Sequence, residues 1–115
     1  TLPQENSLLR YTNFVEVMAP IMNLETTLKL KETFDVNYSS WGLDGLWPHL
    51  LGNPTNKVAI IDSIKMSHTK PPGNPALYSQ IPHSLEYDVQ LAYNKFAPGF
   101  NTPHKEYEKI PSNTK

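Results

Sequence analysis

The chain has 115 residues, the size of one domain, and a formal net charge of −1. It therefore lacks the basic excess with which proteins bind nucleic acid. The sequence contains no cysteine, which excludes disulfides, thiolate zinc sites and cysteine nucleophiles and is compatible with a cytoplasmic location. No apolar run approaches the roughly 20 residues of a membrane span.

The first third of the chain predicts a strand and a helix. Residues Tyr11–Ala19 alternate in the manner of a strand, which Pro20 ends. Asn23 is a suitable N-cap for a helix over residues 24–34. We expect the buried stripe of that helix to consist of Leu24, Leu28 and Phe34.

The stretch WGLDGLWPHLLG, residues 41–52, predicts a second helix. Its apolar residues recur at helical spacing, at positions Leu43, Leu46, Trp47, Leu50 and Leu51. Pro48 lies inside this pattern and is expected to kink or restart the helix, because it has no N–H to donate. The sequence Gly52-Asn53-Pro54 is expected to end the element.

The second half of the chain predicts a strand, a connection and a helix. Lys57–His68 alternates as a strand, with His68 at its end. Residues 69–83 carry four prolines and predict an extended connection. Ser84 is expected to cap a helix that reaches Phe96. Its expected inner face consists of Leu85, Val89, Ala92, Tyr93 and Phe96.

These elements indicate an α/β fold, with a mixed sheet and flanking helices. We expect residues 1–100 to form a single domain and residues 101–115 to form a mobile polar tail, because that tail has no periodicity. Two strands do not make a stable sheet alone. The irregular segments must therefore supply further strands, or the chain completes a larger sheet. An exposed sheet edge would favour a homodimer.

Two polar residues are candidates for chemistry. Asp44 follows a glycine at the start of a predicted helix, where its carboxylate could accept a proton from a hydroxyl or could simply complement the helix dipole. His68 follows a predicted strand, where α/β folds place ligand contacts, although a lone histidine is more often structural. The sequence contains no H-E-x-x-H, G-x-S-x-G or Asp-x-Asp motif, so no complete catalytic set is present.

The two tryptophans allow two interpretations. Trp41 and Trp47 could form a platform on which sugar rings stack, because aromatic faces suit the apolar faces of sugars. They could equally belong to the core. A non-catalytic module that binds carbohydrate or another protein is therefore one hypothesis for this chain, and a remnant without a ligand is another.

The order of several segments resembles the second half of a GT-A glycosyltransferase. FVEVMAPIMN, SSWGLDGLWPHLLG and NKVAIIDSIKMSHTKP follow one another between Tyr11 and Pro72, as in bacterial glycosyltransferase-like proteins of unassigned activity. The resemblance implies a partial GT-A fold that acts on a nucleotide-sugar donor and a carbohydrate acceptor.

The resemblance also implies roles for individual residues. Asp44 would face the acceptor as a base, Trp41 and Gly42 would shape the acceptor pocket, and His68 would ligate Mn²⁺ or Mg²⁺. The half that carries the Asp-x-Asp motif and the nucleotide site is not in this sequence. Because the chain also begins at Thr1 rather than Met, we expect it to be a fragment of a longer protein.

Overall fold

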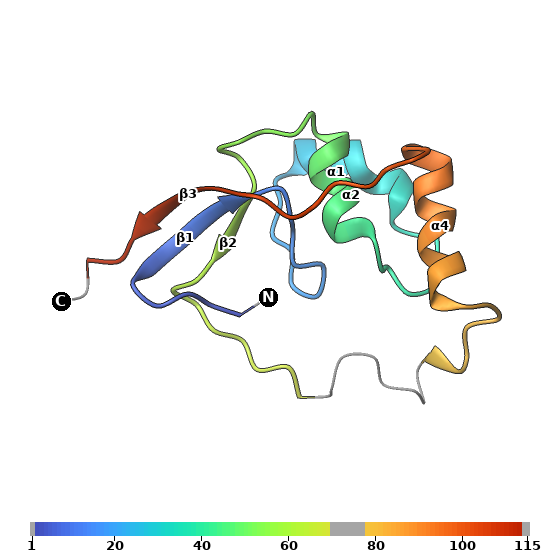
Figure 1. Cartoon of the computed structure of the whole chain (residues 1–115), viewed down its shortest axis with the longest axis horizontal. Helices are drawn as coiled ribbons and strands as arrows, with labels where there is room; N and C mark the ends of the chain where they lie inside the picture. Colours follow the sequence, from blue (N-terminus) through green and yellow to red (C-terminus); the bar gives the residue numbers. More distant parts are fainter. Residues whose placement is uncertain (1, 70–77, 114–115) are drawn as a thin grey trace.

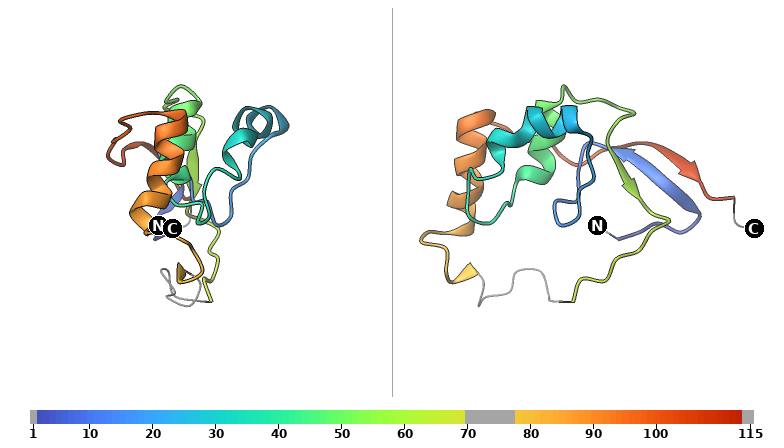
Figure 2. Two further views of the ribbon diagram at one scale, coloured as in Figure 1. Left: turned by 90° about the vertical axis from the view of Figure 1, so that its right-hand side faces the viewer. Right: turned by 180° about the vertical axis from the view of Figure 1, so that it is seen from behind.

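The computed structural model describes residues 2–69 and 78–113, which combine a three-stranded sheet with three α-helices (Figure 1). The sheet lies at one end of the molecule and the helices at the other (Figure 2). The strands are β1 (Ser7–Thr12), β2 (Ala59–Ile61) and β3 (Glu106–Pro111). The helices are α1 (Leu24–Leu30), which continues into the 3-10 turn η1 (Lys31–Thr33), α2 (Leu43–Leu50) and α4 (Leu85–Phe96). The expected combination of α and β elements is confirmed.

The sheet has the order β2-β1-β3. Both strand pairs in the described residues are antiparallel, so the expectation of a mixed sheet is wrong for this part of the chain. Leu9 in the central strand lies opposite Ile61 on one side and Ile110 on the other. The third strand comes from residues 101–115, for which the sequence predicted no element. The single domain over residues 1–100 stays a prediction.

The first predicted strand is wrong in position, because β1 covers Ser7–Thr12 instead of Tyr11–Ala19. The chain leaves the sheet at Asn13, whose side chain bonds to backbone near the start of β3. Its Nδ2 donates to the Pro103 carbonyl at 2.9 Å, and its Oδ1 accepts from the Lys105 amide at 2.6 Å. Side-chain bonds of this kind compete with the strand ladder, and periodicity does not reveal them.

The second predicted strand is much shorter than expected, since β2 ends at Ile61 rather than at His68. Asp62 turns inward and is only 3 % exposed. The amides of Asp62 and Ser63 both donate to the Leu8 carbonyl, at 2.8 and 3.1 Å. Two successive amides that share one acceptor break the alternation of a ladder, so the strand stops there.

The caps predicted for two helices are confirmed. Asn23 Oδ1 accepts from the Thr26 amide at 2.8 Å, and Ser84 Oγ accepts from the Tyr87 amide at 3.2 Å. Each side chain satisfies one of the backbone donors that a helix leaves unpaired at its start.

Helix α2 continues through Pro48 rather than restarting there. Pro48 cannot donate to the carbonyl four residues earlier, which belongs to Asp44. That carbonyl instead accepts from the Val15 amide at 2.9 Å. The proline therefore frees an acceptor that attaches the segment after β1 to the start of α2.

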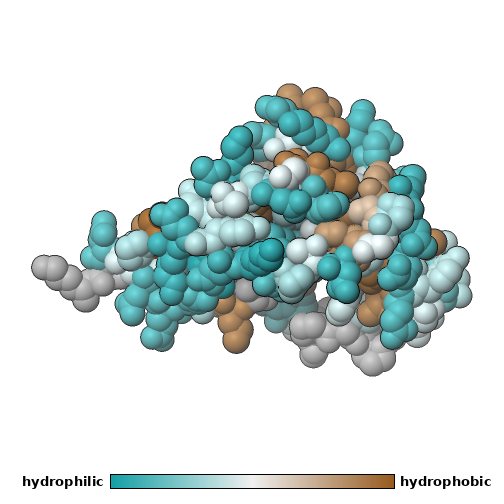
Figure 3. Space-filling view, turned by 45° about the horizontal axis from the view of Figure 1, so that its top comes forward, coloured by the Kyte–Doolittle hydropathy of each residue, from teal (hydrophilic) through white to brown (hydrophobic). Residues whose placement is uncertain are grey.

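The core lies among the helices, where hydrophobic side chains gather on the surface as well (Figure 3). Trp47 is 5 % exposed and donates from Nε1 to Thr33 Oγ1 at 2.8 Å. The stripe predicted for α1 is wrong: Leu24, Leu28 and Phe34 are 73, 55 and 46 % exposed. Helix α1 packs through its last turn instead, because Leu30 and Thr33 are the residues that reach the core. None of the described helices is long and apolar enough to cross a membrane.

One buried ion pair joins the strands. Arg10 of β1 donates from Nε to Asp62 Oδ2 at 2.9 Å and from Nη2 to Asp62 Oδ1 at 3.0 Å. The same carboxylate accepts from Ser7 Oγ and the Gln4 amide, at 2.7 and 3.0 Å. Burial alone would raise the pKa of Asp62, but these hydrogen bonds outweigh it and hold the pKa below its usual value.

Asp62→Asn should lower the free energy of unfolding by about 3–5 kcal/mol, because it removes the buried carboxylate that pairs with Arg10 and leaves that charge only the longer contact with Glu106, at 3.5 Å. Glu25→Gln is the matched control. It removes the exposed pair with Lys29, which is 3.0 Å long, and should change stability by no more than about 0.5 kcal/mol. Urea unfolding at neutral pH measures both variants. Equal effects of the two substitutions would contradict a central role for the buried pair.

Candidate functional site

Asp44 lies in the first turn of α2 and is half-buried. Burial raises the pKa of its carboxyl, and the nearby charge of Glu16 adds to this effect. The Gly45 amide, which donates to Oδ1 at 2.9 Å, and the charge of His104 act in the opposite direction without cancelling the shift. A carboxylate with a raised pKa accepts a proton more readily at neutral pH than an ordinary one.

Tyr93 of α4 belongs to the same neighbourhood. Burial raises the pKa of its hydroxyl, and the charge of Asp44 raises it further. The sequence placed Tyr93 only on an inner helix face and gave no role to His104. Residues so far apart along the chain meet only through tertiary packing, so spacing could not group them with Asp44.

Gly42 brings the start of α2 against α4. Its φ of +88° is in the left-handed region that favours glycine. A Cβ atom at this position would lie 3.0 Å from Val89 Cγ1 and 3.1 Å from Tyr93 Cε1. A larger residue would therefore separate the two helices beside Asp44. Its expected role in shaping an acceptor pocket stays a prediction.

The two tryptophans lie in different surroundings and form no joint platform. Trp47 is buried in the core, as one of the two interpretations of the sequence expected. Trp41 is 42 % exposed. It donates from Nε1 to the Tyr78 hydroxyl at 2.8 Å, and the two rings meet edge to face.

Trp41 adjoins a group of aromatic rings around a hollow of about 310 Å³. Tyr78 and Tyr38 line the hollow, together with Ser39, Gln80 and Ile81. The ring of His83 lies 5.5 Å from that of Tyr38 and 4.8 Å from that of Tyr87. We call this group the aromatic surface; it comprises Tyr38, Trp41, Tyr78, His83 and Tyr87.

The side chain of Asp88 in α4 binds the loop that carries Tyr38 and also binds His83. It is fully buried, and its carboxylate accepts from the Tyr38 amide at 3.1 Å, the Ser39 amide at 2.9 Å and Ser39 Oγ at 2.5 Å. His83 Nε2 lies 2.7 Å from Oδ1. An ionised carboxylate only accepts hydrogen bonds, so this nitrogen carries a proton.

Hydrogen bonds also determine the ionisation of Asp88. Burial by itself would raise the pKa, but donors from Ser39, His83 and the Tyr38 backbone lower it to about 2. The sequence did not single out Asp88. Its spacing offered a signal, because it is three residues after Leu85 and four before Ala92 and so shares the predicted inner face of the helix. A carboxylate buried on such a face requires hydrogen-bond donors from neighbouring segments.

His68 lies in the exposed segment that follows β2, and not at a strand end as expected. Within residues 2–69 and 78–113, no three histidine or acidic side chains are arranged to hold a metal ion. The role of His68 as a metal ligand stays a prediction. No described contact brings it to Asp44.

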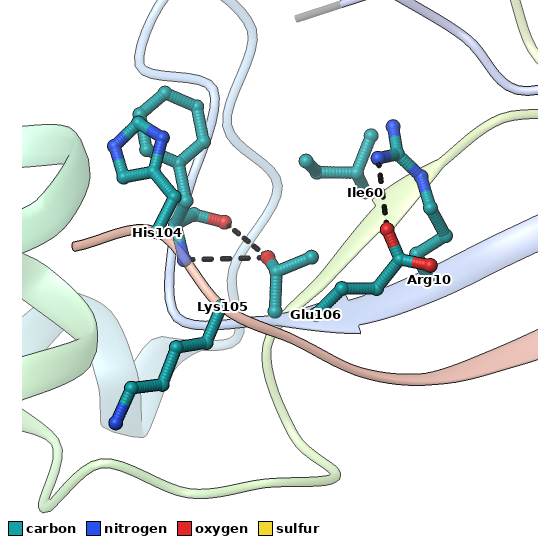
Figure 4. A pocket seen from close by; sticks show the side chains of 7 residues that line it. Arg10, Ile60, His104, Lys105 and Glu106 are labelled. Carbon is teal, nitrogen blue, oxygen red and sulfur yellow. Dashed lines mark hydrogen bonds and ion pairs between the residues drawn. The ribbon is translucent and has the colours of Figure 1, made fainter.

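A second hollow, of about 210 Å³, lies beside the sheet (Figure 4). Arg10 and Glu106 point toward each other at one side of it, and the His104 ring lies 4.2 Å from the Phe14 ring at the other. Lys105 points away. Because Arg10 already pairs with Asp62 and Glu106, its charge serves the fold rather than a ligand.

Comparison with known proteins identifies no family for this chain. No family model, curated protein or solved structure matches the chain.

Acid should destabilise the protein through Asp88. Because the folded state lowers the pKa of this group, its stabilising contribution is present above pH 4 and is lost as the pH falls toward 2. The lost contribution should be about 2 kcal/mol, because the fold lowers the pKa of Asp88 from its ordinary value to about 2. Urea unfolding of the wild type and of Asp88→Asn, each between pH 5 and pH 2 (roughly the window in which carboxylates titrate), measures it.

Asp88→Asn should have a lower free energy of unfolding at neutral pH than the wild type. That free energy should also decrease less steeply as the pH falls. Glu86→Gln changes an exposed acid of the same helix turn and serves as the control. If the free energy of unfolding of Asp88→Asn fell with pH as steeply as that of the wild type, the role given to this carboxylate would be contradicted.

Proposed function

We propose that this chain binds carbohydrate at the aromatic surface. The observation that carries the proposal is the exposed indole of Trp41, which stands beside Tyr78 at the edge of the hollow. Aromatic rings bury the apolar faces of sugars, while a few polar groups select their hydroxyls. Gln80 supplies such a group in the lining of this hollow.

The backbone that carries the aromatic surface is held in place before any ligand binds. Asn37 Nδ2 donates to the carbonyls of Trp41 and Asp88, at 3.0 and 3.1 Å. The Ser40 amide donates to Asn37 Oδ1 at 2.9 Å, and the Trp41 amide donates to Ser39 Oγ at 3.1 Å. A preorganised loop loses little conformational entropy on binding, which favours affinity for a small ligand.

Single-tryptophan variants test this proposal by fluorescence. Trp47→Phe leaves Trp41 as the only tryptophan, and Trp41→Phe leaves the buried Trp47. Titration with neutral trisaccharides (maltotriose, cellotriose and triacetylchitotriose) should change the emission of the first variant, because the sugar would cover its exposed indole. The second variant should show no change.

Circular dichroism of both variants checks that each is folded. Trp41→Ala, made in the wild-type chain, should weaken binding measured by calorimetry at least about tenfold, because the loss of about 1.4 kcal/mol of contact with an aromatic ring is a tenfold change in affinity. The proposal would be contradicted if only the variant that retains Trp47 changed its emission, or if none of the three sugars bound.

A second candidate function is glycosyl transfer, as the C-terminal part of a GT-A-like glycosyltransferase. The support comes from the resemblance between Tyr11 and Pro72 and from the raised pKa of Asp44. Asp44 would accept the proton of the acceptor hydroxyl. Residues outside this sequence would bind the nucleotide-sugar donor, since the sequence holds no Asp-x-Asp motif. A divalent Mn²⁺ or Mg²⁺ ion would neutralise the diphosphate, and His68 is the ligand this chain would contribute.

Asp44→Asn tests this second function in a protein that carries the donor-binding half. The substitution should lower the transfer rate by about 10²-fold or more, because general bases contribute 10²–10⁴-fold. Nucleotide-sugar binding, measured by calorimetry, should stay unchanged. Asp35→Asn, at an exposed acid in the turn after η1, is the matched control and should keep full activity. Equal rates for both variants would remove Asp44 from the mechanism.

A further inference from the structure

The rings of the aromatic surface cross one another at steep angles. The planes of Trp41 and Tyr78 meet at 85°, with ring centroids 6.1 Å apart. The His83 ring is inclined by 75° to the ring of Tyr38 and by 69° to the ring of Tyr87. Tyr38 and Tyr87 are 68 and 56 % exposed. The aromatic surface therefore presents rings to solvent in several orientations.

The segments that carry the aromatic surface are acidic. Residues 34–56 and 78–94 contain four acidic residues and none of the ten lysines and arginines of the sequence. The buried Asp88 carboxylate accepts hydrogen bonds from the amides of Tyr38 and Ser39, both of which line the hollow of about 310 Å³. Because its pKa is about 2, this carboxylate is ionised at neutral pH. A negative charge therefore lies against the backbone that lines the hollow.

The positive features of this region are matched by acids. The N-terminal ends of α2 and α4 carry partial positive charge, but each first turn contains acid: Asp44 in α2, and Glu86 and Asp88 in α4. Among the five residues of the aromatic surface only His83 can become positive, and its Nε2 lies 2.7 Å from the Asp88 carboxylate. None of the five residues therefore carries an unpaired positive charge that would repel a cationic ligand.

We propose that, among carbohydrates, the aromatic surface prefers amino sugars whose amine is free and protonated. This inference rests on the carbohydrate binding proposed above and names the class of sugar. A cation over the face of an aromatic ring is attracted by the quadrupole of the ring. A neutral sugar gains nothing from this attraction or from the negative charge beside the hollow, so it should bind more weakly.

The ring angles allow one sugar to contact two rings. A sugar that stacks on an aromatic ring lies parallel to it, so the equatorial substituents of the sugar project sideways. Beside Trp41, one sideways direction leads to Tyr78, whose ring stands nearly at right angles. An equatorial ammonium group can therefore approach a second ring while the sugar stays on the first. Gln80 also lines the hollow, and its amide oxygen can accept a hydrogen bond from the ammonium group.

Cellotriose and the β-1,4-linked trimer of glucosamine test this preference. The two sugars differ only at C2, where the first has a hydroxyl and the second an amine. Calorimetry of the full chain at about pH 6, below the pKa of an α-amino group, keeps most of the amines protonated. We expect cellotriose to have a dissociation constant at least about threefold higher than the glucosamine trimer. This ratio should fall when the salt concentration rises from about 0.05 to about 0.5 M, because salt screens charges.

A pair of charge variants locates the attraction. Glu86→Gln should lower the ratio, because it removes an exposed acid that directly precedes Tyr87. Glu108→Gln in β3 is the matched control. It removes the same charge from an exposed site at the sheet end of the molecule and should leave the ratio unchanged (Figure 2). An equal decrease in both variants would indicate attraction to the overall charge of the protein and would overturn the inference.

The wild type separates this inference from the proposed function. If both trimers bound with the same dissociation constant, the preference for amino sugars would be wrong, while the carbohydrate site itself would be supported. If neither trimer bound, both proposals would fail. A ratio that high salt or Glu86→Gln left unchanged would also overturn the inference, because the preference would then not come from charge.

Discussion

The sheet depends on one buried carboxylate. Asp62 accepts hydrogen bonds from Arg10 and Ser7 of the central strand β1 and from the Gln4 amide that precedes it, and Arg10 in turn reaches Glu106 of β3 at 3.5 Å. A short strand such as β2 contributes few ladder bonds, so these side-chain bonds carry much of its attachment. They also explain why the strand stops: a residue whose side chain must turn inward cannot continue the alternation at an edge.

A second buried carboxylate organises the helical half. Asp88 binds the loop before α2, and that loop presents Trp41 and Tyr38 on the surface. The position of the proposed sugar site therefore follows from an acid that no ligand would touch. Its low pKa means that it stays ionised across the physiological range, so the loop keeps its shape there.

The link between the segment after β1 and α2 arises from a missing hydrogen bond. Pro48 leaves the Asp44 carbonyl without its helical donor, and Val15 supplies one. This contact places the backbone of residues 13–16 next to the side chain of Asp44, where Glu16 contributes to its raised pKa. The electrostatic environment of Asp44, the residue that resembles a catalytic acid, therefore depends on a backbone contact that Pro48 makes possible.

The sequence by itself determined the helices that carry their own caps and spacing, because Asn23, Ser84 and the Leu43–Trp47 stripe act within a few residues. It also identified Trp41 and Asp44 as candidates. Only the tertiary structure decided the strands, since Asn13 and Asp62 end them through partners on distant segments. It likewise decided which tryptophan is exposed, because burial depends on neighbours that local periodicity does not encode.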